Sequence, residues 1–131
     1  SQDLIFLISE LKDLSVTDGQ YVHRFEQILF KITNLDEPDS ILLLPQFFND
    51  NSEHDELMFS LIHSIEQFDD IIYATKLIQV LPNLYENAPF WCSVLLKRVR
   101  NNKGTEQILN ILLESKDESF RNFVNSIFLK N

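Results

Sequence analysis

Apolar residues recur every 33 positions along this chain of 131 residues. Three positions of the repeat are apolar in four successive copies: Phe25, Met58, Trp91 and Val124; Ile28, Leu61, Val94 and Ile127; and Leu29, Ile62, Leu95 and Phe128. A period in the thirties with two helices per unit is typical of an α-solenoid, because each hairpin buries its apolar stripe against its neighbours. The repeat predicts an all-α fold, a short HEAT-like α-solenoid of about four helical hairpins and about eight helices, with residues 1–131 as one domain. The alternative is a compact bundle whose helices match by chance because they share one spacing.

Apolar spacing and capping residues place the expected helices. They are predicted at about residues 4–14, 20–34, 36–48, 53–68, 69–81, 89–101, 105–112 and 117–128. Acidic or hydroxyl residues are expected to cap four of them: Asp36, Asp69 with Asp70, Thr105 and Asp117. Pro45 is expected to kink the third helix or end it early, and Pro82 to stop the fifth. The two Gly and four Pro of the chain leave few sharp turns for a sheet protein.

The negative charge of the chain is concentrated in residues 32–75. This segment has ten acidic residues and no Lys or Arg, so its formal charge of −10 exceeds the −9 of the whole chain. A local acidic surface repels nucleic acid and anionic membrane, and it speeds the encounter with a basic partner. We therefore expect a cationic protein as the partner, with no direct nucleic acid and no membrane. The alternative is that these acids only keep a 44% hydrophobic chain soluble.

One face of the predicted fourth helix combines carboxylates with an aromatic residue. Glu56, Phe59, His63 and Glu66 are spaced to form a row away from the apolar stripe. In helical stacks of this kind the second helices line the concave surface, where the row would meet a partner. The position of His63 in the repeat is apolar in the other copies, so a half-buried packing role stays open for it and for Phe59. The candidate partner-binding residues are Asp50, Glu53, Asp55, Glu56, Phe59, His63, Glu66, Asp69 and Asp70.

The sequence contains no pattern that predicts catalysis, a metal or a cofactor. His54 has acidic neighbours, but consecutive residues at a helix start point in different directions, and no His-x-x-x-His or Cys pair accompanies it. Cys92 could in principle pair with His63 as a nucleophile, yet its apolar neighbours favour a packed thiol. There is also no glycine-rich phosphate loop and no Gly-x-Ser-x-Gly. We expect a protein that is not an enzyme.

Other features of the sequence indicate a cytoplasmic protein. A lone cysteine cannot form an internal disulfide, which suits a reducing compartment. No apolar run approaches the roughly 20 residues that span a bilayer, and no charged-then-apolar leader opens the chain. Four basic residues, Lys97, Arg98, Arg100 and Lys103, lie near a predicted helix C-terminus, where cations are favoured, and we interpret them as structural.

Several segments of the chain resemble one protein family. They are Leu57-Met58-Phe59-Ser60-Leu61-Ile62-His63-Ser64-Ile65-Glu66-Gln67-Phe68-Asp69-Asp70, then Leu81-Pro82-Asn83-Leu84, then Asn87-Ala88-Pro89-Phe90-Trp91, with Asp36-Glu37-Pro38 before them. Together they resemble the immunity protein 30 family of bacterial polymorphic toxin systems. The resemblance implies a small cytoplasmic protein, encoded beside a toxin delivered by contact-dependent or related secretion, that neutralises this toxin by binding it.

The family and the charge pattern together suggest a specific mode of action. Toxin domains in such systems are often nucleases, whose nucleic-acid clefts are basic. We therefore expect the acidic surface to cover the basic active-site face of a cognate toxin, without chemistry. The alternative is a general helical-repeat scaffold that gathers two cellular proteins and has no toxin partner.

Overall fold

The structure, a computed structural model, describes residues 1–129 and consists of helices joined by short loops. The elements are α1 (Gln2–Lys12), α2 (Tyr21–Leu35), α3 (Ser40–Leu43), the 3-10 helix η1 (Leu44–Phe47), α4 (Asp55–Ile65), α5 (Asp70–Asn87), α6 (Pro89–Asn101), α7 (Lys103–Glu114) and α8 (Glu118–Leu129). No strand occurs within residues 1–129, which confirms the all-α prediction. None of these helices has the length and apolar character needed to cross a membrane.

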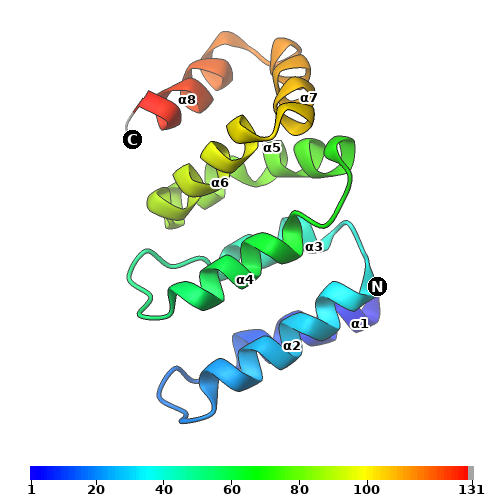
Figure 1. Cartoon of the computed structure of the whole chain (residues 1–131), viewed down its shortest axis with the longest axis vertical. Helices are drawn as coiled ribbons and strands as arrows, with labels where there is room; N and C mark the ends of the chain where they lie inside the picture. The colour runs from blue at the N-terminus through cyan, green and yellow to red at the C-terminus, as the bar shows by residue number, and fades with distance from the viewer. Residues whose placement is uncertain (130–131) are drawn as a thin grey trace.

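The helices form hairpins that stack along the long axis of the molecule (Figure 1). Within the hairpins α1 packs on α2, η1 on α4, α5 on α6, and α7 on α8. Between hairpins α2 packs on α4, α3 on α5, α5 on α7, and α6 on α8. Each hairpin therefore contacts the next one in the chain, which is the order of contacts that an α-solenoid requires.

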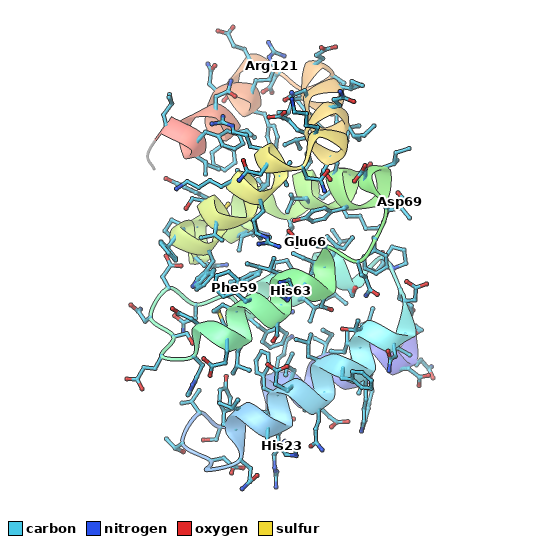
Figure 2. All side chains as sticks on the ribbon, viewed as in Figure 1. His23, Phe59, His63, Glu66, Asp69 and Arg121 are labelled. Carbon is cyan, nitrogen blue, oxygen red and sulfur yellow. The ribbon has the colours of Figure 1, made fainter. Side chains whose placement is uncertain are left out.

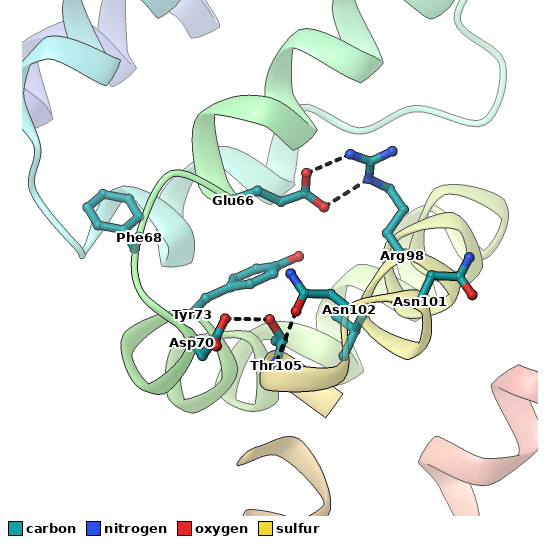
Figure 3. A pocket seen from close by; sticks show the side chains of 9 residues that line it. Glu66, Phe68, Asp70, Tyr73, Arg98, Asn101, Asn102 and Thr105 are labelled. Atoms are coloured by element: carbon teal, nitrogen blue, oxygen red, sulfur yellow. Dashed lines mark hydrogen bonds and ion pairs between the residues drawn. The ribbon is translucent and has the colours of Figure 1, made fainter. Parts of the chain in front are cut away.

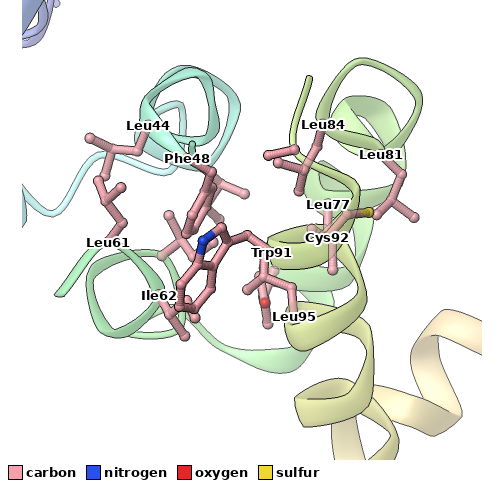
Figure 4. Close-up of a cluster of buried hydrophobic side chains, with 14 of the residues drawn as sticks. Leu44, Phe48, Leu61, Ile62, Leu77, Leu81, Leu84, Trp91, Cys92 and Leu95 are labelled. Carbon is pink, nitrogen blue, oxygen red and sulfur yellow. The ribbon is translucent and has the colours of Figure 1, made fainter. Parts of the chain in front are cut away.

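The 33-residue repeat places equivalent side chains of α2, α4, α6 and α8 at similar depths. Phe25, Met58, Trp91 and Val124 are all buried. Of the other eight repeat positions, only Val94 and Phe128 are half-buried rather than buried. Figure 4 shows Leu61, Ile62, Trp91 and Leu95 in one cluster with side chains of η1 and α5. The predicted register of the even-numbered helices is confirmed, because the repeat marks the positions that fill the core.

Pro82 does not stop the fifth helix, and that prediction is wrong. α5 continues through Pro82 to Asn87. An interior proline costs about 3 kcal/mol, because it lacks the N–H of the helical hydrogen bond. Leu81 and Leu84 on either side of it are almost fully buried, and their burial contributes about 2 kcal/mol each. Tertiary packing of the last turns of α5 therefore outweighs the local cost of the proline.

Pro45 acts as predicted, although the third helix is shorter than expected. The α-helical hydrogen bonds of α3 end at Leu43, and the chain continues as the 3-10 helix η1 with Pro45 in its first turn. The expected N-cap is wrong, because Asp36 ends α2 in a left-handed conformation with φ of 53°. The fourth helix is also shorter than predicted and runs from Asp55 to Ile65.

The remaining capping predictions are partly confirmed. Asp69 caps α5 by accepting a hydrogen bond from the backbone N–H of Ile72 at 3.0 Å, and Asp117 accepts one from Phe120 at 2.8 Å. Thr105 was expected to cap α7, but Asn102 does so instead. Thr105 lies within α7, and its hydroxyl donates a hydrogen bond to Asp70 instead of capping the helix.

Candidate functional site

The exposed side of α4 carries part of the row predicted from the sequence (Figure 2). Asp55, Glu56, Phe59 and His63 are all exposed. Asp55 and Glu56 occupy the first turn, where negative charge also stabilises the helix dipole. Of the two roles left open for His63, the half-buried one does not apply, because His63 is exposed. Its repeat equivalents Phe30 and Leu129 are exposed too, and only Leu96 is buried.

Phe59 belongs to an aromatic cluster that the sequence did not predict. Its ring lies edge-on to Trp91, with centroids 5.3 Å apart, and Phe90 contacts the same indole at 5.2 Å. Trp91 is buried, whereas Phe59 is 40% exposed and Phe90 is 55% exposed. Phe90 was not predicted as a site residue. The sequence feature that could have identified it is a large aromatic side chain outside the apolar stripe of α6.

Carboxylates adjoin this aromatic cluster. Asp55 and Glu56 precede Phe59 by four and three residues, which puts them on neighbouring positions of the helix surface. Asp55 has no ion pair within residues 1–129, and in the same part of the chain the Glu56 carboxylate pairs only with His54, at 3.4 Å. We call the surface formed by Asp55, Glu56, Phe59 and Phe90 the acidic–aromatic face. Exposed aromatics among charged residues are the usual anchors of protein interfaces.

Glu66 is engaged within the chain. Its two carboxylate oxygens accept hydrogen bonds from Nε and Nη2 of Arg98, both at 2.8 Å. This bidentate ion pair joins the end of α4 to the last turn of α6, and these bonds raise the pKa of Arg98. The structural interpretation of Arg98 is confirmed, and Arg100 is likewise engaged, because its guanidinium lies 3.8 Å from the centre of the Phe128 ring.

Three more of the predicted acids hold helix N-termini. Asp50 accepts hydrogen bonds from the backbone N–H of Phe90 at 2.9 Å and of Trp91 at 3.3 Å, and so caps α6 from a different hairpin. Asp69 caps α5, and Asp70 accepts a hydrogen bond from the Thr105 hydroxyl at 2.8 Å. The structure therefore separates the nine predicted residues into internal ties and exposed groups. Asp50 and Asp69 are exposed as well, but their carboxylates accept backbone hydrogen bonds. The exposed residues whose side chains hold no helix end and pair with no Lys or Arg in residues 1–129 are Glu53, Asp55, Glu56, Phe59 and His63.

The histidines and the cysteine do not form a reactive site among the described residues. Within residues 1–129 no group of three or more His, Cys, Asp or Glu side chains could hold a metal ion. His54 Nδ1 lies 3.4 Å from Glu56 Oε1, and its ring tilts against Tyr21. Cys92 is fully buried, as predicted for a packed thiol. Burial, with a smaller effect of the Asp50 charge, raises the pKa of Cys92 to about 12, so the thiolate is disfavoured.

The fold and the site together define a class of protein. Stacked helical hairpins present exposed aromatics and unpaired carboxylates on one face, and these are the features of a small helical-repeat binding protein.

Comparison with known proteins gives the family. The family model of immunity protein 30 matches residues 11–109, which is well over half of the chain. The chain belongs to this family, and it is therefore an immunity protein that acts against a toxin by binding it. The match includes the acidic–aromatic face and ends within α7, before α8 begins. No curated protein and no solved structure matches the chain.

Proposed function

We propose that this immunity protein neutralises a cognate secreted toxin domain, a nuclease, by covering its basic active-site face with the acidic surface of residues 32–75. One observation supports the charge of the partner above all others. Ten acidic residues occur in this segment without one Lys or Arg, and Glu53 and Asp55 have no cationic partner within residues 1–129. Unpaired charges that repel one another lower stability, so their concentration suggests a gain in the bound state.

The proposed contact residues are those that are free to meet a partner. Glu53, Asp55, Glu56, Phe59 and His63 would touch the toxin together with Phe90. Asp50, Glu66 and Asp70 would act indirectly, since each already accepts a hydrogen bond from another hairpin. Asp69 would do so as well, through its cap of α5. The acids would replace the phosphates of the toxin's substrate in charge, without any chemical step.

The two parts of the acidic–aromatic face would contribute differently to binding. Carboxylates attract a basic surface over distance, which raises the association rate. Phe59 and Phe90 would be desolvated in the complex and slow its dissociation, because binding energy concentrates in a few aromatic anchors. We also propose that residues 1–131 act as one non-enzymatic domain in the cytoplasm, where Cys92 stays reduced.

The test is protection of bacteria that express the toxin encoded beside this protein. The double variant Asp55→Lys and Glu56→Lys replaces two exposed acids and should lose protection by at least tenfold in surviving cells. The matched control is Glu114→Lys with Glu118→Lys, which makes the same charge change on exposed acids of α7 and α8. Glu118 lies in the first turn of α8, as Asp55 and Glu56 do in α4, so this half of the control also reproduces a lost dipole interaction, whereas Glu114 lies at the end of α7 and controls for charge alone.

Three outcomes separate the parts of this proposal. Equal protection by both double variants would place the toxin contact elsewhere. A neighbouring toxin that leaves DNA and RNA intact would contradict the nuclease assignment while keeping the acidic contact. A chain with no toxin encoded beside it and several cellular partners would favour a scaffold.

A further inference from the structure

A polar pocket of about 370 Å³ lies where the α4–α5 turn meets the end of α6 and the start of α7 (Figure 3). We call it the Tyr73 pocket; its lining includes Glu66, Asp70, Tyr73, Arg98, Asn102 and Thr105. It is separate from the acidic–aromatic face, which is built at the N-terminal ends of α4 and α6. Three hairpins contribute to its walls, so the pocket depends on how the repeats are stacked.

The hydroxyl of Tyr73 is the unexplained group in this pocket. Tyr73 is only 4% exposed, and its hydroxyl has no hydrogen-bond partner among residues 1–129. Figure 3 shows the hydroxyl directed into the space between Glu66 and Asn102. An unpaired buried hydroxyl is costly, and most such groups in proteins have a partner. Burial and the nearby charge of Glu66 raise the pKa of Tyr73, so the hydroxyl is protonated and can donate.

The pocket offers more unused donors than unused acceptors. Asn102 uses its side-chain oxygen to cap Thr105, which leaves its NH₂ group without a partner in the described chain. Arg98 uses Nε and Nη2 on Glu66, and its Nη1 has no hydrogen-bond partner in residues 1–129. Both Glu66 oxygens and one oxygen of Asp70 already accept hydrogen bonds. A ligand that satisfies the pocket must therefore bring an acceptor, such as a carbonyl or carboxylate oxygen.

The charge of the lining selects between these acceptors. Two carboxylates, Glu66 and Asp70, face one guanidinium, Arg98, so the lining has a formal charge of −1. Asp70 lies against the start of α7, where it offsets the positive end of the helix dipole and makes this N-terminus a poor site for an anion. A carboxylate would meet this repulsion, whereas a neutral carbonyl would not.

We propose that the Tyr73 pocket binds a neutral amide group of a partner protein, whose carbonyl accepts from Tyr73 and Asn102. The amide N–H would face the remaining lone pairs of Asp70 or Glu66. An Asn or Gln side chain and an exposed peptide bond both supply this group. That the partner is the toxin rests on the proposed function, whereas the preference of the pocket for an amide does not.

The test uses the free protein and small probes in NMR titrations. Acetamide represents an Asn or Gln side chain, N-methylacetamide a peptide bond, and acetate the anion. The side-chain NH₂ signal of Asn102 and the Nε–H signal of Arg98 report on the pocket. We expect saturable chemical-shift changes with one or both amides, at a Kd on the order of 10 mM for such small ligands. The amide that binds more tightly shows whether the partner supplies a side-chain amide or a peptide bond.

Two variants in the pocket and one control variant keep the test specific. Tyr73→Phe should weaken amide binding about fivefold, because it removes one donor without changing the ring. Asn102→Asp retains the cap of α7 but replaces the donating NH₂ with an acceptor, and should abolish binding. Tyr21→Phe, far from the pocket, should change nothing. Saturable binding of acetate in preference to both amides, equal binding by Tyr73→Phe, or no saturable shift with either amide would each overturn the proposal. Since no toxin is present, these results leave the proposed function untouched.

Discussion

The carboxylate of Asp70 occupies the space that a side chain at Gly104 would need. A Cβ built on Gly104 would collide with Oδ2 of Asp70, whose other oxygen accepts the hydrogen bond from Thr105. Glycine at the start of α7 therefore allows the α5 and α7 N-termini to approach closely. This contact joins the third hairpin to the fourth and forms one wall of the Tyr73 pocket.

The Asp70–Gly104 contact predicts a change of sign in a double-mutant cycle. Gly104→Ala in the natural chain should lower the free energy of unfolding by about 1 kcal/mol, because Asp70 must leave Thr105. In the Asp70→Ala background the same substitution should raise it by about 0.5 kcal/mol, because alanine favours the helix. Urea denaturation of the four proteins measures both effects. Additive effects would show that Asp70 does not fill this space.

Replacing Pro82 should stabilise the protein. Pro82→Ala restores a backbone N–H within α5, and Pro82 is exposed, so no packing is lost. We expect a gain of about 1–2 kcal/mol in the free energy of unfolding, which is less than the full cost of an interior proline because Pro82 also stiffens the unfolded natural chain. Pro89→Ala is the control, since Pro89 starts α6 where proline is favoured. Thermal unfolding should show a higher Tm for the first variant and an unchanged or lower Tm for the second.

The buried thiol predicts a decline of stability at alkaline pH. The pKa of Cys92 is about 12 in the folded chain, against 9.0 for an unperturbed thiol. The folded state therefore holds the proton more tightly, and this contribution is fully present below pH 9 and is lost as the pH rises towards 12. The loss attributable to Cys92 is at most about 1.4 kcal/mol per pH unit. Urea denaturation of the natural chain and of Cys92→Ala, both under reductant, should give curves that converge above pH 9. A constant difference between them would contradict the burial of this group.

The acidic surface predicts a salt-dependent association rate with the toxin. Between low and high ionic strength the rate of the natural chain should fall by about tenfold or more, because screening shortens the range of the attraction. Asp55→Lys with Glu56→Lys should lower the rate at low salt and flatten this dependence. Stopped-flow or surface-binding kinetics measure both. An association rate that increases with salt would mean that the toxin's contact surface is not basic.

Phe59 and Phe90 should determine the lifetime of the complex rather than its formation. Truncation of either to alanine should speed dissociation about 10- to 100-fold and change the association rate little. Phe6 is exposed to a similar extent as Phe90 but lies on α1, so Phe6→Ala is the control. An equal effect of Phe6→Ala would mean that the loss is not specific to the acidic–aromatic face, and unchanged dissociation with both Phe59→Ala and Phe90→Ala would place the interface elsewhere.

Local sequence signals predicted much of the fold. The 33-residue spacing identified the core positions of four helices, since a side chain that repeats on one helix face must be buried against a neighbour. Asp69, Asp117 and Pro45 act as expected, because capping and the missing proline N–H operate within one turn. Pro82 and Thr105 did not follow local rules. The burial of Leu84 beside Pro82 and the hydrogen bond from Thr105 to Asp70 both depend on residues that are distant in the chain.

The sequence by itself determined the helical class, the repeat and the concentration of charge in residues 32–75. Composition and spacing are properties of the chain alone, so folding does not change them. Only the tertiary structure decided which acids are free. Glu66, Asp70 and Asp50 each accept hydrogen bonds from another hairpin, over separations of 32 to 41 residues. The donors are Arg98 for Glu66, Thr105 for Asp70, and the backbone amides of Phe90 and Trp91 for Asp50. Whether a carboxylate is paired depends on the approach of distant helices, and this is settled when the hairpins stack.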